Sequence, residues 1–376
     1  MKKIGFYKFI AGFIFLVFPL LVSATVNLPP YIPKVYEKKA TNFPRAFIIS
    51  GAHGDELGGY LSALYLYKTL NLKNGDVKFL PFLNIKTIVR TYRYLDGVGD
   101  INDKFAFSRS NLLQLPKDVF KKIGFVKKEI EEFKPDVVLS LHAGWGFSIR
   151  DKRRWGNSIT IDEKRYKNIE LYSKAEKVLN AINLYNPYRY ENYSIKVLNI
   201  FSKDVKSEMN DFSTWVLKAG FPVYTIESSK NLSLGRQIYN TSFATIKFLK
   251  LYGFKIENEK AVLNRKNIEK FLSSLRKKKV KIEFVIDNKT RYYFCKYEKE
   301  LKVPVDETAE ISIPKIEIND FGYFLIPKSE FNYKQRYNFK RFINFKIKYL
   351  DVNRKKYSDY CFIKFVVKRE TASSGK

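Results

Sequence analysis

Short apolar runs alternate with segments of helical periodicity over the first two thirds of the chain. Four runs are short, rich in β-branched residues and bounded by glycine or proline, as strands are. They are RAFIIS (45–50), DVKFLPFLN (76–84), PDVVLSLHAG (135–144) and FPVYTIESS (221–229). Three segments between them place apolar residues three and four positions apart, which predicts helices over 55–70, 119–133 and 163–182. This alternation predicts an α/β fold with helices on both faces of a sheet.

The pattern changes after about residue 257. Residues 257–279 are typical of a helical segment or a linker, and strand-like runs separated by turn residues follow. We therefore predict a first domain over 25–257, a helical linker over 258–280 and a small all-β, sandwich-like domain over 281–370. The third region contains no histidine and no convergent set of acids, so its expected role is accessory, including contact with a protein partner.

The first 24 residues have the pattern of a secretory signal. Lys2, Lys3 and Lys8 precede or begin an apolar run, and the small residues of VSA (22–24) fit a cleavage site before Thr25. An uncleaved membrane anchor is the alternative. No later stretch is long and apolar enough to span a bilayer, so we expect an exported protein, and a bacterial periplasm as its destination.

The charge of the chain has two interpretations. A formal net charge of +31 favours acidic partners such as anionic lipid, nucleic acid or carboxylate-rich cell-wall peptide. However, the lysines are spread along a sequence rich in Asn, Ile, Phe and Tyr, and no basic tract carries a stacking motif, so no nucleic-acid partner is expected. Cys295 and Cys361 either form one disulfide or remain buried thiols.

Candidate metal ligands follow two of the predicted strands. His53 and Glu56 lie three residues apart just after the first strand, and His142 lies at the end of another. These are the two histidines of the sequence, and the carboxyl ends of strands in open α/β sheets are where ligands bind. Two histidines and one glutamate match a catalytic zinc site with one open position. The alternative is a pair of hydrogen-bonded loop histidines without a metal.

A zinc hydrolase also needs a general base, and Glu227 is the candidate. It ends the apolar strand in FPVYTIESS, at the same predicted edge as the ligands. By itself this position also fits a surface residue that terminates a strand.

These residues resemble the zinc carboxypeptidases of the carboxypeptidase A type. GAHGDE (51–56), LHAGWGF (141–147) and ESSK (227–230) follow the order of that family. The segments RRWGNSITIDE (153–163) and SKNLSL (229–234) are similar to its periplasmic peptidoglycan D,L-carboxypeptidases, which determine helical cell shape. The resemblance covers about 40–255 and implies a mixed-sheet zinc peptidase domain followed by β-sandwich modules. It also implies cleavage of the γ-D-glutamyl–diaminopimelate bond in tripeptide muropeptides.

The resemblance assigns roles to further residues. It makes His53, Glu56 and His142 the ligands of one zinc ion and Glu227 the base. Arg93 matches the arginine that polarises the scissile carbonyl, with Arg90 as an alternative. Substrate contacts are expected from two further residues, Asn102 and Arg154.

One position departs from the family. Where the family has Asn-Arg, with the arginine binding the terminal carboxylate of the substrate, this chain has Asn102 followed by Asp103. Three explanations are open: Lys104 or Arg109 supplies the cation, the substrate presents an amine there, or turnover was lost while binding persists.

The sequence therefore predicts a periplasmic zinc carboxypeptidase that trims peptidoglycan stem peptides. Two rivals remain. An aspartoacylase-like zinc deacylase shares the HGDE pattern, and a non-catalytic or altered-specificity peptidoglycan-binding protein would explain Asp103.

Overall fold

The structure is a computed structural model that describes two regions of the chain. The first comprises 33–88, 91–186, 188–201 and 211–275. The second comprises 279–287, 289–296, 300–305, 308–312, 316–317, 323–327, 335–338, 344–351 and 356–367. The predicted signal over 1–24 and the candidate Arg90 lie outside these ranges. Within them, no helix has the length and apolarity to cross a bilayer.

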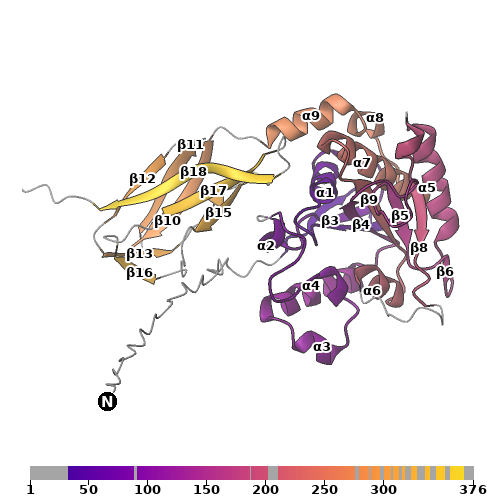
Figure 1. Ribbon diagram of the computed structural model, residues 1–376, viewed down its shortest axis with the longest axis horizontal. Coiled ribbons are helices and arrows are strands. Elements are labelled where there is room, and N and C mark those ends of the chain that lie inside the picture. Colours follow the sequence, from indigo (N-terminus) through magenta and orange to yellow (C-terminus); the bar gives the residue numbers. More distant parts are fainter. Residues whose placement is uncertain are drawn as a thin grey trace, which may run out of the picture.

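A seven-stranded mixed sheet forms the centre of the first region (Figure 1). Its strands are β1 (Tyr36–Lys39), β2 (Arg45–Ser50), β3 (Asp76–Leu80), β4 (Val137–Gly144), β5 (Ser158–Ile161), β8 (Ser194–Val197) and β9 (Val223–Ser229). Their order is β1-β3-β2-β4-β9-β5-β8. The inner strands β3, β2, β4 and β9 are parallel, whereas β1 and β5 pair antiparallel with their neighbours β3 and β9. The predicted strands at 45–50, 76–84, 135–144 and 221–229 are thus confirmed, with β3 ending earlier than predicted.

Helices cover both faces of this sheet, as predicted. They are α1 (Leu57–Thr69), α2 (Ile85–Ile88), α3 (Arg109–Leu113), α4 (Lys117–Phe133), α5 (Tyr172–Leu184), α6 (Phe212–Lys218), α7 (Leu234–Leu251), α8 (Glu259–Val262) and α9 (Arg265–Ser274), with the 3-10 turns η1 (Asn102–Lys104) and η2 (Arg189–Glu191). Figure 1 shows α1 and α7 on one side of the sheet and α4 on the other.

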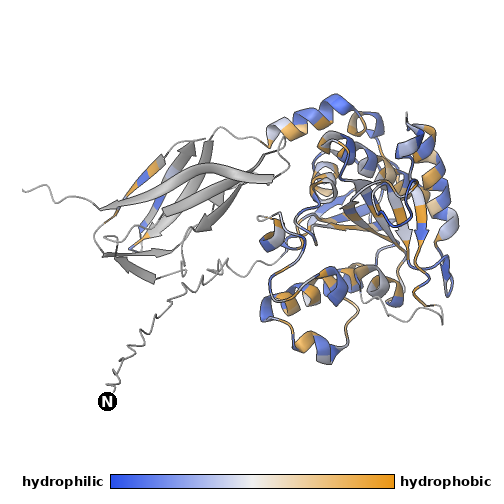
Figure 2. Cartoon of the chain, viewed as in Figure 1, coloured by the Kyte–Doolittle hydropathy of each residue, from blue (hydrophilic) through white to orange (hydrophobic). Residues whose placement is uncertain are grey.

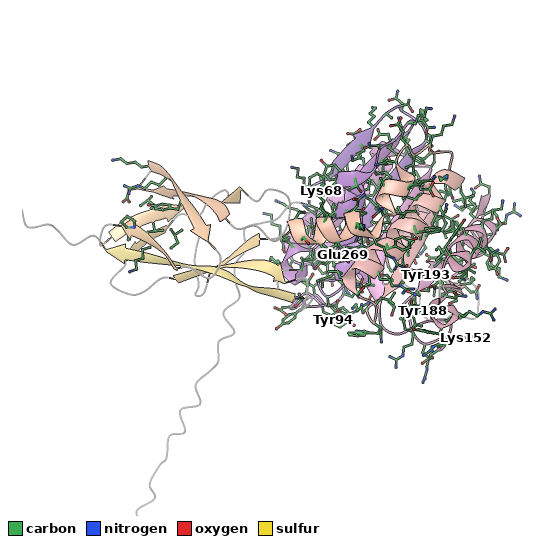
Figure 3. The ribbon with its side chains drawn as sticks, turned by 90° about the horizontal axis from the view of Figure 1, so that it is seen from above. Lys68, Tyr94, Lys152, Tyr188, Tyr193 and Glu269 are labelled. Carbon is green, nitrogen blue, oxygen red and sulfur yellow. The ribbon has the colours of Figure 1, made fainter. Side chains whose placement is uncertain are left out.

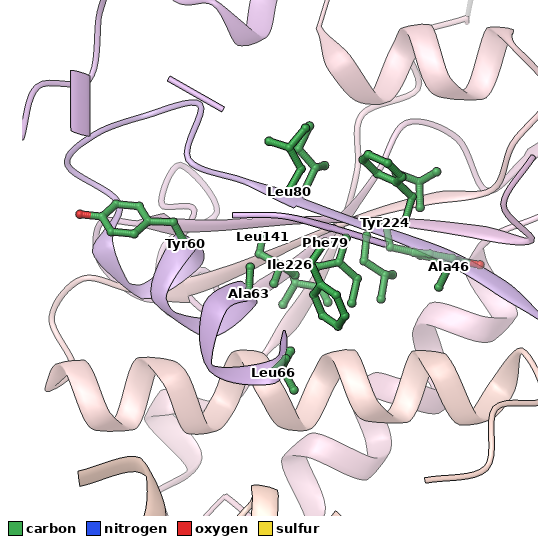
Figure 4. Close-up of a cluster of buried hydrophobic side chains, with 14 of the residues drawn as sticks. Ala46, Tyr60, Ala63, Leu66, Phe79, Leu80, Leu141, Tyr224 and Ile226 are labelled. Carbon is green, nitrogen blue, oxygen red and sulfur yellow. The ribbon is translucent and has the colours of Figure 1, made fainter. Parts of the chain in front are cut away.

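The core lies between the sheet and these helices. Apolar side chains of β2, β4 and β9, such as Phe47, Leu139 and Ile226, are fully buried. Figure 4 shows this cluster, with Leu66 of α1 beneath it. Helix α1 is buried along most of its length because it is enclosed between the sheet and α7, whereas α4 is amphipathic and carries its polar residues outward (Figure 2).

The helix predicted over 163–182 is wrong in its first half. Residues Arg165–Tyr166 (β6) and Ile169–Glu170 (β7) form a hairpin, and α5 starts only at Tyr172. Tyr166 and Ile169 are three residues apart, a spacing that imitates a helix. The positive φ of Lys167, 52°, closes a tight turn instead.

Past Leu275 the described residues other than Asp287 lie in strands, in the region where strands were predicted. They are β10 (Lys279–Ile286), β11 (Lys289–Lys296), β12 (Glu300–Val305), β13 (Thr308–Ser312), β14 (Ile316–Glu317), β15 (Tyr323–Pro327), β16 (Gln335–Asn338), β17 (Asn344–Asp351) and β18 (Lys356–Val367). One sheet has the order β11-β10-β13-β16, with β14 on β10, and the other has the order β12-β18-β17-β15. The domain boundaries and the sandwich arrangement stay predictions. The state of the cysteines also stays a prediction, because the side chains of Cys295 and Cys361 lie outside the described part.

Candidate active site

The turn after β2 carries two of the predicted metal ligands. Gly51 has a φ of +76°, a conformation that L side chains rarely adopt, and it directs the chain out of the sheet. At Gly54, an added Cβ would lie 1.9 Å from the carbonyl oxygen of Thr87, so only glycine fits there. Glu56 is the N-cap of α1, but its side chain makes no capping hydrogen bond. Its carboxylate is therefore available to turn toward His53.

The strands β4 and β9 place the other two functional side chains next to each other. His142 and Glu227 are partners in the register of these parallel strands. Both are buried, at 5% and 8% exposure. Since neighbouring residues in register project from the same face of a sheet, the ladder itself brings this histidine and this acid to one site.

The three predicted ligands meet as the sequence predicted. Donor atoms of His53, Glu56 and His142 all lie within 4.8 Å of one another. Nδ1 of His53 lies 2.8 Å from Oε1 of Glu56, and Nδ1 of His142 lies 2.8 Å from Oε2. Two imidazole nitrogens and a carboxylate oxygen form a donor set typical of catalytic zinc.

The second nitrogen of each ring is also held. With Nδ1 directed toward a metal, Nε2 carries the proton. Nε2 of His53 then donates to the carboxylate of Asp100, at 2.8 Å, and Nε2 of His142 donates to the hydroxyl of Ser140, at 2.9 Å. Such partners fix the ring orientation and the tautomer of metal-binding histidines. The residues present therefore fit a metal ion.

The electrostatics of the site favour a positive charge. Burial alone would lower the pKa of His53, but the carboxylates of Glu56 and Asp100 outweigh it and raise the pKa to about 10. Burial opposes the ionisation of Glu56, yet the two histidines hold its pKa well below the usual value. The negative potential that favours a proton on His53 equally favours a cation between the ligands.

Glu227 has the properties of a general base. Burial, followed by the nearby charge of Glu56, raises its pKa to about 7. Within the described part of the chain, its Oε2 atom has no hydrogen-bond partner. A buried carboxylate with a pKa near neutrality and a free oxygen is suited to accept a proton from water.

Arg93 reaches the same site from a loop. Its guanidinium donates to Oε1 of Glu56 at 2.7 Å, and it lies 3.8 Å from Asp100. Burial works against the charge of Arg93, but Glu56 and Asp100 raise its pKa above the ordinary value. The side chain remains 41% exposed, so it can also turn toward a bound substrate.

A cavity of about 420 Å³ connects these groups. The ligands, Glu227 and Arg93 all line it, as do the predicted substrate residues Asn102 and Arg154. Lys104 does not line it: its ammonium group lies 4.9 Å from the centre of the Phe107 ring. Charged side chains such as Lys152 project from the α/β region (Figure 3).

Several residues of the site were not predicted from the sequence. Asp100 is the main one, because its contact with His53 joins residues 47 positions apart. Its only local signal is the Gly-Asp pair before Asn102. Asp211 and Thr160 also line the cavity, at the start of α6 and on β5. Asp211 stands in no recognisable motif, whereas Thr160 lies within RRWGNSITIDE (153–163) but was not singled out there.

Residues 1–268 match the catalytic part of the carboxypeptidases that control helical cell shape. The chain belongs to this family. It is therefore a metallo-carboxypeptidase by family, and the His-Glu-His group is the part of the described structure that can hold the metal. No curated protein matches the chain in sequence.

Solved structures of the cell shape determinant protein Csd4 from Helicobacter pylori share the fold of this family member. The apo and the tripeptide-bound structures are each 19% identical to the chain, with a TM-score of 0.57, and cover 89% of this chain and 100% of that chain. The mDAP-bound form, described as a D,L-carboxypeptidase, is 18% identical, with a TM-score of 0.56 over 88% and 100% of the two chains. At this identity the likeness establishes the fold.

Proposed function

We propose that this chain is an exported zinc carboxypeptidase that trims peptidoglycan stem peptides. The bond cleaved is the one between γ-D-glutamate and the terminal diaminopimelate of a tripeptide stem. The observation that carries the proposal is the convergence of His53, Glu56 and His142, with Glu227 beside them, in the cavity of a chain from the cell-shape carboxypeptidase family.

The substrate class is supported by the relatives and by the sequence. Csd4, which has the same fold, was solved with a tripeptide and with mDAP. The signal-like residues 1–24 support export to the periplasm, where peptidoglycan lies. The donor set of two imidazoles and one carboxylate supports zinc over the harder ions magnesium and calcium, which prefer oxygen ligands.

Each residue of the site has a defined task in such a reaction. Zinc would supply a Lewis acid that polarises the scissile carbonyl and makes water more acidic. Glu227 accepts the proton from the attacking water at its free Oε2 and delivers it to the leaving amine. The guanidinium of Arg93 donates to the carbonyl oxygen as negative charge develops there. Asp100 and Ser140 keep the two imidazoles in the required tautomer.

The test combines metal analysis with defined substrates. Purified full-length protein is incubated with tri-, tetra- and cross-linked muropeptides, with zinc or with a chelator, and the products are identified by mass. We expect zinc-dependent release of diaminopimelate from the tripeptide. Glu227→Gln should retain zinc and lose about 10²- to 10⁴-fold in kcat, because it removes only the base.

The control variant is Glu132→Gln on α4, an exposed residue outside the cavity that changes the net charge by the same amount. It should cleave the tripeptide like the unaltered chain. Protein that holds no zinc and releases nothing from any muropeptide would contradict the proposal. Muropeptides that bind but stay uncut would favour a non-catalytic wall-binding role.

A further inference from the structure

Part of the cavity wall is acidic, although the chain has a formal net charge of +31. Asp103 on η1 and Asp211 before α6 both line the cavity, and η1 contacts α6. Partial burial and the charges of Asp100 and Asp211 raise the pKa of Asp103. The cavity therefore holds two neighbouring negative charges apart from the metal ligands.

These two acids differ from three of the other four acids in the cavity wall; the fourth is the candidate base Glu227. Three other acids have a cationic partner at 2.8 Å or less; the pairs are Asp55–Lys230, Asp100–His53 and Glu56–Arg93. Neither Asp103 nor Asp211 forms an ion pair with any residue that the structure describes. One carboxylate oxygen of Asp211 caps α6, because it accepts a hydrogen bond from the backbone N–H of Thr214 at 2.8 Å. The charges of Asp103 and Asp211 are therefore not neutralised by an ion pair within the described part of the chain.

A second observation in the same cavity is a buried hydroxyl without a hydrogen-bond partner. Thr160 lines the cavity and is 5% exposed, and its Oγ1 makes no hydrogen bond within the described ranges. A buried polar atom of this kind is costly unless something in the cavity satisfies it. The hydroxyl can accept a hydrogen bond from a bound group.

The register of β5 and β9 places this hydroxyl relative to Glu227. Thr160 pairs with Thr225, which lies two residues before Glu227 on the same face of β9. Two residues along a strand span about 7 Å. A substrate side chain of four carbons with a terminal nitrogen spans a similar distance. If the scissile peptide bond lies beside Glu227, this nitrogen can reach Thr160.

We propose that Asp103 and Asp211, with the hydroxyl of Thr160, bind the free ammonium group on the side chain of the residue that is released. The proposal rests on the proposed function and names its specificity determinant. Charge-assisted hydrogen bonds from an ammonium to carboxylates are strong, and a neutral group cannot replace them. Aspartate at position 103 thus selects an amine.

The experiment compares three synthetic stem tripeptides that differ only in their last residue. It is diaminopimelate, lysine or norleucine; lysine and norleucine differ in the ammonium group. The full-length zinc-loaded chain should cleave the two amine-bearing stems with kcat/KM at least about tenfold above that of the norleucine stem. Equal kcat/KM for lysine and norleucine would overturn the proposal while leaving the proposed function intact.

Binding to Glu227→Gln, measured by calorimetry, gives a second readout that does not depend on turnover. The lysine stem should bind at least about tenfold more tightly than the norleucine stem. If the unaltered chain cleaves no stem, the proposed function fails. The ratio of the two binding affinities still tests whether the amine site exists. A ratio near one, or no binding of either stem, overturns it.

Variants of the two acids assign the effect to residues. Asp103→Asn and Asp211→Asn should each lower the lysine-to-norleucine ratio, whereas Asp103→Glu should retain most of it. Asparagine at position 211 can still cap α6, so the fold is preserved. Glu132→Gln on α4 should leave the ratio unchanged. A ratio that neither asparagine variant lowers would overturn the assignment.

Discussion

The active site has two halves that are built differently. His142 and Glu227 stand on the adjacent central strands β4 and β9 and are aligned by the hydrogen-bonded ladder itself. His53, Glu56 and the residues that contact them, Arg93 and Asp100, come from the turn after β2 and from the loop before η1. The first half is positioned by backbone, whereas the second half is positioned by side-chain contacts. Substitutions should therefore have unequal effects on the two halves.

The largest expected effect is at Glu56, the residue that joins the halves through a contact with each histidine. Glu56→Gln removes the charge that a metal ion needs and leaves both Nδ1 atoms without their anionic partner. We expect zinc content, measured by elemental analysis, to fall from about one ion per chain to near none. Tripeptide cleavage should be lost with it.

Glu129→Gln on α4 is the control for a loss of one negative charge in the same domain, because Glu129 pairs with Lys78 away from the cavity. Full zinc retention by Glu56→Gln would contradict the assigned ligand set.

A smaller effect separates the halves directly. Asp100→Asn removes the anionic partner of His53 in the loop half and should lower zinc affinity about 10- to 100-fold, as measured by competition with a chelator. Ser140→Ala removes the corresponding partner of His142 in the strand half. We expect a smaller loss there, because a neutral hydroxyl contributes less and the strand already fixes the backbone of His142.

Equal losses in the two variants would show that the two halves do not differ in this way. Circular dichroism of both variants should match that of the unaltered chain, which excludes unfolding as the cause.

The smallest expected effect is a gradual change of kcat/KM with pH. Burial and Glu56 raise the pKa of Glu227 to about 7 in the metal-free site, so below this pH the carboxyl is protonated and cannot act as a base. The positive charge of bound zinc stabilises the carboxylate and shifts its pKa downward. The kcat/KM should therefore fall about tenfold per pH unit on the acid side, with an apparent pKa of about 7 or lower.

Infrared titration of the Glu227 carboxyl, with Glu227→Gln as the reference, can follow this group without zinc and with zinc. A pKa that rises on zinc addition would contradict the placement of Glu227 beside the metal site.

The strand half of the site was more accessible from the sequence than the loop half. His142 and Glu227 end buried apolar runs, and a run of that kind predicts both the strand and the edge at which it ends. His53 and Glu56 follow a third run closely enough to be found in the same way. Arg93 was found only through the family resemblance, and Asp100 was missed, since no periodicity connects a loop residue with a histidine 47 positions earlier.

The false helix at 163–170 has a related cause. Spacing alone does not distinguish a helical face from a hairpin. The positive φ at Lys167 distinguishes them here, but this residue is not a glycine, so the sequence gives no sign of the turn.

The sequence by itself determined the alternation of strands and helices, the sheet edge at which the candidate site lies, and which residues are the candidate metal ligands and the candidate base. These follow from local apolar patterns and from residues standing next to them in the chain. Only the tertiary structure decided that Asp100 supports His53 and that Asp103 and Asp211 line one cavity, with no ion-pair partner for either among the described residues. Such contacts join segments far apart in sequence, and they depend on how loops pack over the sheet edge. The energies involved are electrostatic and vary with distance and burial, which no local pattern encodes.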